Sequence, residues 1–175
     1  MEVLPLQYGV TLKLQTYLKI KKLVTPRTEE LAFCWDIQRL RMQNRNVFVA
    51  INTNSRYGVV AAGMKVADVR DMAAFMKKII SIGMYDIGYD MKRIEHYFQL
   101  AGDVVLTKTH GRKAVGDMNR AIMDMRFFDD AFFDDEFYQP EFSCYINRDI
   151  CTPTGFDTYG YPEDFFKLDM ERLGI

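Results

Sequence analysis

A basic turn between an apolar run and a helical pattern holds the residues best suited to chemistry. The apolar run is residues 104–106, the turn is residues 107–113, and a helix-like pattern begins directly behind it. Backbone N–H groups and cationic side chains would then meet at a helix N-terminus, where an anion is favoured. The candidate anion-binding residues, for a phosphate or a carboxylate, are Lys108, Thr109, His110, Arg112 and Lys113.

The alternative for this turn is a capped helix start with solvated basic side chains. The turn is not a P-loop, because the GxxxxGK[ST] spacing is missing. His110 is the best general acid or base, since histidine titrates near neutrality, and Asp103 or Asp117 would be its partner. We assign no catalytic residue, because neither HExxH nor GxSxG is present, and a non-enzymatic protein is favoured.

A second candidate site is the segment 127–138, in which pairs of aromatic residues alternate with acidic residues. Carboxylates in such a row imitate a nucleic-acid backbone and can occupy a basic groove on another protein. The alternative is a loop whose phenylalanines enter the core while the acids stay in water. The candidate partner-binding residues are Asp129, Asp130, Asp134, Asp135, Glu136, Phe132 and Phe133.

Charge is divided along the chain although the net charge is only −1. Residues 1–123 hold 19 Lys and Arg against 11 Asp and Glu, whereas residues 124–175 hold 4 against 13. Two readings remain open: the acidic end folds against the basic part, or the acidic end meets another molecule. Net charge alone gives no case for nucleic-acid binding.

Length and composition indicate one α+β domain spanning residues 1–175, with 49% hydrophobic and 27% charged residues. No run is long and apolar enough to span a membrane, and the first residues lack a signal-peptide pattern. Three cysteines without CxxC spacing indicate reduced thiols and a cytoplasmic protein. Cys144 and Cys151 with His96 or His110 lack the close spacing of a zinc site, so we expect no metal and no cofactor.

The expected elements run from strands to helices and back to strands. Alternation predicts a first strand at 11–15, and apolar runs separated by polar turns predict strands at 33–38, 47–51 and 57–62. Helical spacing predicts helices over 69–80, 94–101 and 115–125, with Gly83 as the stop of the first and Asp90 as the cap of the second.

Further strands are expected at 104–106 and 142–146, followed by a short helix near 165–173. The whole predicts a mainly antiparallel sheet with three to four helices packed on one face.

Four short motifs give the chain a family likeness. They are Cys34-Trp35-Asp36, residues 52–57, Ala101-Gly102-Asp103 and, most strongly, the segment 107–119 with Gly116-Asp117-Met118-Asn119. On these motifs, residues 30–150 resemble an uncharacterised bacterial family known as a domain of unknown function. The resemblance implies a small cytoplasmic protein and a fold, but no catalytic assignment. The first 25 residues depart from the family pattern, in which a short strand carries Cys-Thr-Lys-Lys.

The leading hypothesis is a non-enzymatic interaction protein that binds a protein or ribonucleoprotein partner through its charged surface. Such a protein would serve a phage or mobile element as an inhibitor of a host nucleic-acid-handling complex. Direct nucleic-acid binding is open but less favoured, no membrane is expected as a partner, and the sequence leaves the oligomeric state unknown. The second hypothesis is a protein or enzyme that binds a phosphate-containing ligand at the 107–113 turn.

Overall fold

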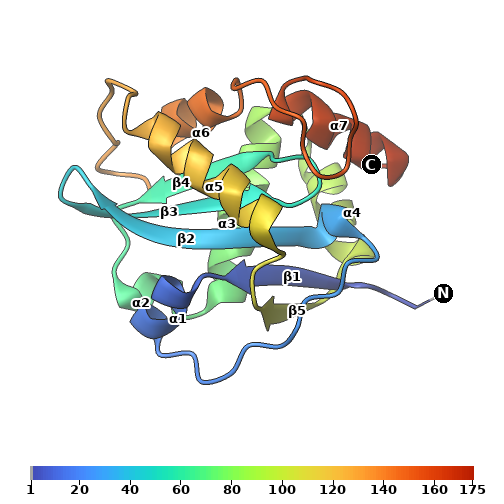
Figure 1. Cartoon of the computed structure of the whole chain (residues 1–175), viewed down its shortest axis with the longest axis horizontal. Coiled ribbons are helices and arrows are strands. Elements are labelled where there is room, and N and C mark those ends of the chain that lie inside the picture. Colours follow the sequence, from blue (N-terminus) through green and yellow to red (C-terminus); the bar gives the residue numbers. More distant parts are fainter. Residues whose placement is uncertain (1) are drawn as a thin grey trace.

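A five-stranded mixed sheet organises the chain, whose computed structural model describes residues 2–175 (Figure 1). The strands lie in the order β4-β3-β2-β1-β5. Strand β1 pairs in parallel with both β2 and β5, whereas β2, β3 and β4 form an antiparallel meander. The strands are β1 Pro5–Val10, β2 Cys34–Met42, β3 Arg45–Asn52, β4 Gly58–Ala62 and β5 Gly102–Thr107.

The α+β class is confirmed, but the sheet is mixed and not mainly antiparallel as expected, because two of its four strand pairings are parallel. The chain begins with strand β1, which the sequence pattern missed, and this strand makes both parallel pairings. The predicted strand at 11–15 is wrong, because these residues cap and begin a helix. Thr11 caps it by accepting from the Leu14 N–H, and Leu14 is the one fully buried side chain of that helix.

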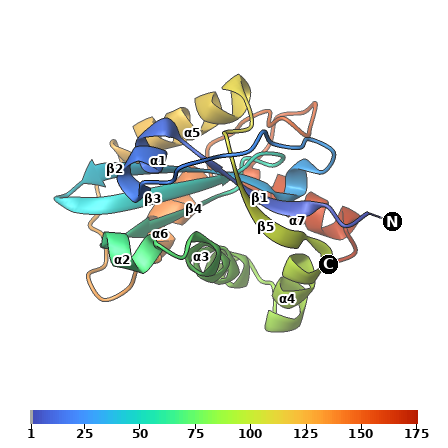
Figure 2. The same cartoon turned by 90° about the horizontal axis from the view of Figure 1, so that it is seen from below.

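Helices cover both faces of the sheet, not one face as expected (Figure 2). Helices α3, α4 and α7 pack on one face around Trp35 and Tyr97, and α5 and α6 pack on the other. Across residues 2–175 the α-helices are α1 Leu12–Leu18, α2 Val66–Val69, α3 Met72–Asp86, α4 Met91–Leu100, α5 Arg112–Met125, α6 Pro140–Ile146 and α7 Pro162–Arg172.

Gly83 does not end α3 but lies inside it. A Cβ at this position would lie 2.6 Å from Val59 Cγ1, so the glycine lets α3 approach strand β4 closely. The other predicted boundary is confirmed: Asp90 caps α4 by accepting from the Arg93 N–H at 2.9 Å. No helix in the described part of the chain has both the length and the apolar character needed to cross a bilayer.

The predicted strand at 142–146 is wrong, because these residues form α6 beside the outer edge of β4. Pro140 begins the helix, and residues four apart share its faces. Phe142 and Ile146 enter the core, whereas Ser143 and Asn147 turn to the strand edge. The Asn147 amide accepts from the Gly58 N–H at 2.8 Å and donates to the Gly58 carbonyl at 2.7 Å, so side chains replace the missing next strand.

Candidate functional site

A buried histidine and aspartate join the basic turn to the sheet. His110 Nδ1 lies 2.7 Å from Asp36 Oδ1, and the His110 backbone N–H donates to both carboxylate oxygens at 3.1 Å. The side chains of both residues are almost completely buried. Gly9 lies opposite Asp36 in the register of β1 and β2, and a Cβ there would overlap the carboxylate and lie 2.9 Å from His110 Nδ1.

The contact with Asp36 determines which ring nitrogen of His110 is left for another partner. Because the carboxylate takes Nδ1, the remaining ring nitrogen is Nε2, the usual arrangement of a histidine that acts as a base or ligand. Nε2 is buried and has no hydrogen-bond partner within residues 2–175. An unsatisfied buried polar atom of this kind requires an explanation in structure or function.

The Asp36–His110 pair lies at a topological switch point of the sheet, where successive connections from β1 lead to opposite sides of that strand. From β1 the chain reaches β2 on one side, and β5 later joins β1 on the other side. Gly9 near the end of β1 pairs with Thr107, the last residue of β5, and His110 follows three residues later. Ligands of open α/β sheets bind outside the carboxyl ends of parallel strands at such a switch point.

Helix α5 begins two residues after His110. Gly111 is its N-cap, with φ of 103°, and no side chain of the described residues bonds to the exposed N–H groups of its first turn. Lys108 and Arg112 are exposed, and neither forms an ion pair within residues 2–175. Lys113 is engaged, because it donates to the Thr152 carbonyl at 2.9 Å and lies 3.6 Å from an Asp117 oxygen.

The structure therefore divides the five residues predicted to bind an anion. Lys108 and Arg112 are open to solvent, Thr109 is half-buried, and Lys113 is tied to neighbouring groups. His110 points inward, and its partner is neither Asp103 nor Asp117. The signal for Asp36 was present in the sequence, since a carboxylate between Trp35 and Ile37 interrupts an otherwise apolar strand.

The acidic–aromatic segment, residues 127–138, forms most of the loop between α5 and α6 (Figure 1). All five of its carboxylates are exposed. Asp134 pairs with Arg45, and no other carboxylate of the segment forms an ion pair within residues 2–175. The acidic end of the chain is thus largely unmatched by its own cations at this loop.

The phenylalanines of the segment divide between core and solvent. Phe127 is 79% exposed and Phe133 is 46% exposed. Phe132, predicted to contact a partner, is 4% exposed and stacks on Phe142 with ring centroids 4.2 Å apart. Phe132 therefore anchors the loop, and its ring is not available to another molecule.

Two glutamines hold the segment in place. Gln43 donates to the Asp130 carbonyl at 2.7 Å and accepts from the Phe132 N–H at 3.2 Å. The buried Gln139 accepts from the Phe133 N–H at 2.7 Å and donates to the Glu136 carbonyl at 2.9 Å. The carboxylates are thus carried on a loop whose backbone is fixed at two points.

A hollow of about 430 Å³ adjoins the end of the acidic–aromatic segment. Ile79 and Ile82 of α3 give it apolar walls, and Asp135 and Glu136 contribute two carboxylates to its lining. The Lys78 ammonium lies 5.3 Å from the centre of the Phe137 ring. An apolar hollow bordered by carboxylates suits a side chain that is partly apolar and positively charged.

A buried arginine network was not foreseen from the sequence. Arg56, in the turn after β3, is 2% exposed and lies 3.1 Å from Asp149, which also pairs with Arg120. Burial raises the pKa of the Cys151 thiol, and the adjacent Arg56 guanidinium opposes that rise. Arg56 therefore ties the turn to the segment after α6 and does not contribute to an exposed surface.

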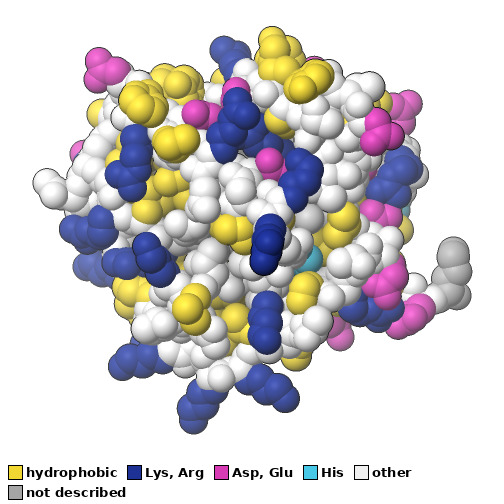
Figure 3. Space-filling model, in the orientation of Figure 1, with side chains coloured by type: hydrophobic (Ala, Val, Ile, Leu, Met, Phe, Trp, Pro, Cys, Tyr) yellow, Lys and Arg dark blue, Asp and Glu magenta, His cyan; other side chains and the backbone are white. Residues whose placement is uncertain are grey.

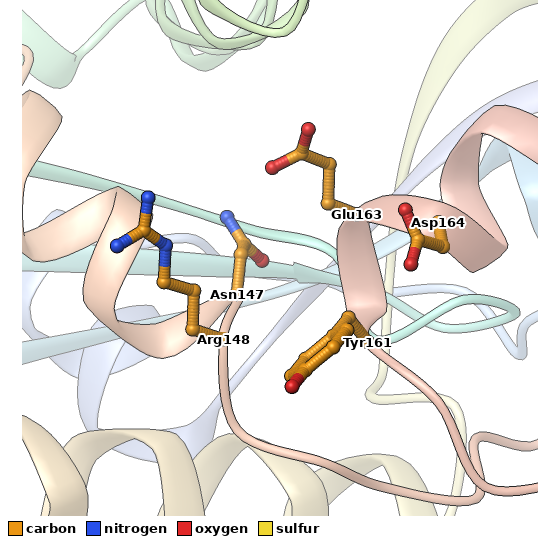
Figure 4. Close-up of a pocket in the computed structure, with 5 residues that line it drawn as sticks. All are labelled: Asn147, Arg148, Tyr161, Glu163 and Asp164. Carbon is orange, nitrogen blue, oxygen red and sulfur yellow. The ribbon is translucent and has the colours of Figure 1, made fainter.

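A hollow of about 310 Å³ lies between the end of α6 and the start of α7 (Figure 4). Arg148 points away from Glu163 and Asp164, and Asn147 is already bonded to β4. This arrangement directs no set of groups at a common point. No group of three or more His, Cys, Asp or Glu side chains placed to hold a metal occurs among residues 2–175.

Comparison with known proteins gives one match. A family model described as a domain of unknown function, DUF6933, matches residues 7–165. No curated protein and no solved structure matches the chain. The match also covers residues 7–29, which include most of β1 and all of α1, and residues 151–165, beyond the 30–150 range expected from the sequence motifs. The chain belongs to this family, and because the family description assigns no activity, its function is argued from geometry.

Proposed function

We propose that this member of the DUF6933 family binds a macromolecular partner through its acidic–aromatic segment. One observation carries the proposal: four of the five exposed carboxylates have no cation of the described chain against them, and exposed Phe127 and Phe133 accompany them. Unpaired carboxylates on a surface attract a positively charged partner, and exposed aromatic rings supply contact area. The glutamine contacts fix the loop, so less backbone entropy is lost on binding.

The class of partner follows from the same features. A row of carboxylates on a fixed loop imitates phosphates, and it fits a basic groove that otherwise holds nucleic acid. We extend the proposal to a protein or ribonucleoprotein that handles nucleic acid, with this protein as its inhibitor. A phage or mobile element would be a suitable source for such an inhibitor.

Charge reversal tests the proposal without disturbing the loop. Asp129, Asp135 and Glu136 would be replaced by Lys, because their side chains make no hydrogen bond within residues 2–175. The matched control reverses the same number of exposed acids elsewhere: Asp103, Asp157 and Glu171.

Affinity capture from the native host would be quantified for the wild type and both variants. We expect basic nucleic-acid-handling proteins to be captured by the wild type and the control but lost with the segment variant. Added polyanion should compete for the same proteins. The same captured set for all three chains would remove the proposal.

A second candidate function is supported by the start of α5. Within residues 2–175 no side chain caps its first turn, and Lys108 and Arg112 lie beside it without an ion-pair partner. We propose this turn as a site for a phosphate-containing ligand. A saturating ligand at about 100 times its Kd would stabilise the native state by about 2.7 kcal/mol.

Thermal melts with inorganic phosphate, nucleotides and sugar phosphates test the second candidate. We expect at least one to raise the Tm of the wild type but not of the Lys108→Gln, Arg112→Gln variant. The matched control is Lys92→Gln, Arg93→Gln, which removes the same charge from α4. A panel without any shift would reject the site.

A further inference from the structure

The basic surface at α1 and α2 is not used by either proposed function. Residues 11–24 contain Lys13, Lys19, Lys21 and Lys22 and no acidic residue. All four lysines are exposed, as is Arg70 just after α2. We call these five residues the α1–α2 basic surface.

The cations of this surface have no carboxylate partners among residues 2–175. None of the five forms an ion pair with any residue of the described chain. The acids on either side of Arg70 in the sequence, Asp68 and Asp71, accept hydrogen bonds from backbone N–H groups at the starts of α2 and α3. Figure 3 shows Lys and Arg side chains gathered at the lower left and bottom of the molecule, where α1, α2 and the following loop lie in Figure 1.

A small pocket opens among these cations. It has a volume of about 250 Å³ and lies between α1 and α2. Ile20, Val66 and Met72 give it apolar walls, and Lys19 and Arg70 are part of its lining. Tyr17 also lines it, and the ring of Tyr17 is oriented by the Arg39 guanidinium, which lies 3.8 Å from its centre.

We infer that the α1–α2 basic surface binds single-stranded nucleic acid, with one base in the pocket and the adjoining phosphates on the lysines. Single-strand binders combine a basic track for the backbone with aromatic side chains that contact the bases. A base within a duplex is stacked and paired, so the pocket favours a single strand. An acidic peptide would satisfy the cations but would bring no flat ring for the pocket beside Tyr17.

The inference is independent of the acidic–aromatic segment, because it uses other residues and the opposite charge. Net charge gave no reason to expect it, since the acids of residues 124–175 cancel these lysines in the total. The structure gathers the lysines away from that part of the chain.

Fluorescence anisotropy with a labelled oligothymidylate at low salt provides the test. The full chain would be compared with the variant Lys13→Glu, Lys21→Glu, Lys22→Glu. Lys13 is in the first turn of α1, where an acidic residue favours the helix, so this change does not disfavour folding. The matched control is Lys92→Glu, Arg93→Glu, Arg126→Glu, all exposed and outside the surface. A variant with Gln at the three lysine positions provides a second measurement if the reversed variant does not fold.

We expect the wild type and the control to bind, and the variant to bind at least tenfold more weakly. Loss of three phosphate contacts should make the slope of log K against log salt shallower by about 2. An abasic strand should bind about fivefold or more weakly than the thymidylate strand, the smallest effect expected of a stacked base. A duplex should bind more weakly than the single strand.

Several outcomes would overturn the inference. No binding at low salt, or equal loss in the variant and the control, would remove the basic surface as the site. Equal binding of the abasic and thymidylate strands would remove the base from the pocket. Equal binding of polyglutamate would show a surface for acidic protein, not for nucleic acid.

Discussion

Gly9→Ala is the perturbation that most directly tests the buried Asp36–His110 pair. The added Cβ would overlap the Asp36 carboxylate, and the carboxylate is held by three bonds from His110. Displacing it weakens hydrogen bonds to a buried charged group, at about 1.5–3 kcal/mol, and adds packing strain of about 1–3 kcal/mol. The alanine also reduces the conformational entropy of the unfolded chain, which offsets about 0.4–1 kcal/mol of this destabilisation. We expect a net loss of about 2–5 kcal/mol in the free energy of unfolding.

Urea unfolding of a double-mutant cycle would measure this loss. Gly9→Ala would be made in the wild type and in Asp36→Ala, where the carboxylate that the Cβ would overlap is gone and the 2.9 Å approach to His110 Nδ1 remains. In the second background the cost should fall below about 1 kcal/mol. Gly116→Ala is the control, because nothing lies within 4 Å of a Cβ there and a helix interior should gain about 0.5–1 kcal/mol. An equal cost of Gly9→Ala in both backgrounds would refute the reasoning.

Three further changes test other parts of the structure. Asn147→Ala removes both hydrogen bonds to the Gly58 backbone and should lower the free energy of unfolding by about 2–4 kcal/mol. The Gly58 amide should then exchange its hydrogen faster, and an unchanged exchange rate would contradict this prediction. Tyr97→Phe removes the hydroxyl that accepts from the indole N–H of Trp35, the only tryptophan in the sequence, and should lower the free energy of unfolding by about 1–3 kcal/mol. An unchanged midpoint of urea unfolding would contradict this expectation. The Arg172 guanidinium lowers the pKa of Glu30, so Glu30→Gln should cost about 1 kcal/mol at pH 7. That difference should vanish as pH falls below the ordinary glutamate range, and a constant difference would argue against the pair.

Local patterns predicted the elements that depend on neighbouring residues. The β3–β4 hairpin follows from two apolar runs around a polar turn, and α5 follows from apolar residues at helical spacing. Asp90 was identified as a cap because capping is a contact over three residues. Each of these features is decided within one short stretch of sequence, the longest being the β3–β4 hairpin, Arg45–Ala62.

Long-range pairing decided the elements that were predicted wrongly. Residues 142–146 have the apolar character of a strand, but the edge of β4 is closed by a helix whose polar side chains reach it. Residues 11–15 alternate like a strand, but only Leu14 is buried, so alternation had no sheet face to match. The parallel strand β1 carries a proline and a glycine, and its place in the sheet comes from partners 27 to 98 residues away.

The candidate sites show the same division. From the order of residues alone it follows that residues 1–123 carry an excess of cations and residues 124–175 an excess of acids, and that a basic turn precedes α5. The packing of distant elements turns His110 inward to Asp36, makes Phe132 an anchor while Phe127 stays exposed, and buries Arg56. The charge and the type of each residue can be read directly from the sequence. Which side chains are buried, and which groups they contact, depends on how strands and helices distant in sequence pack together. A single sequence does not specify that packing.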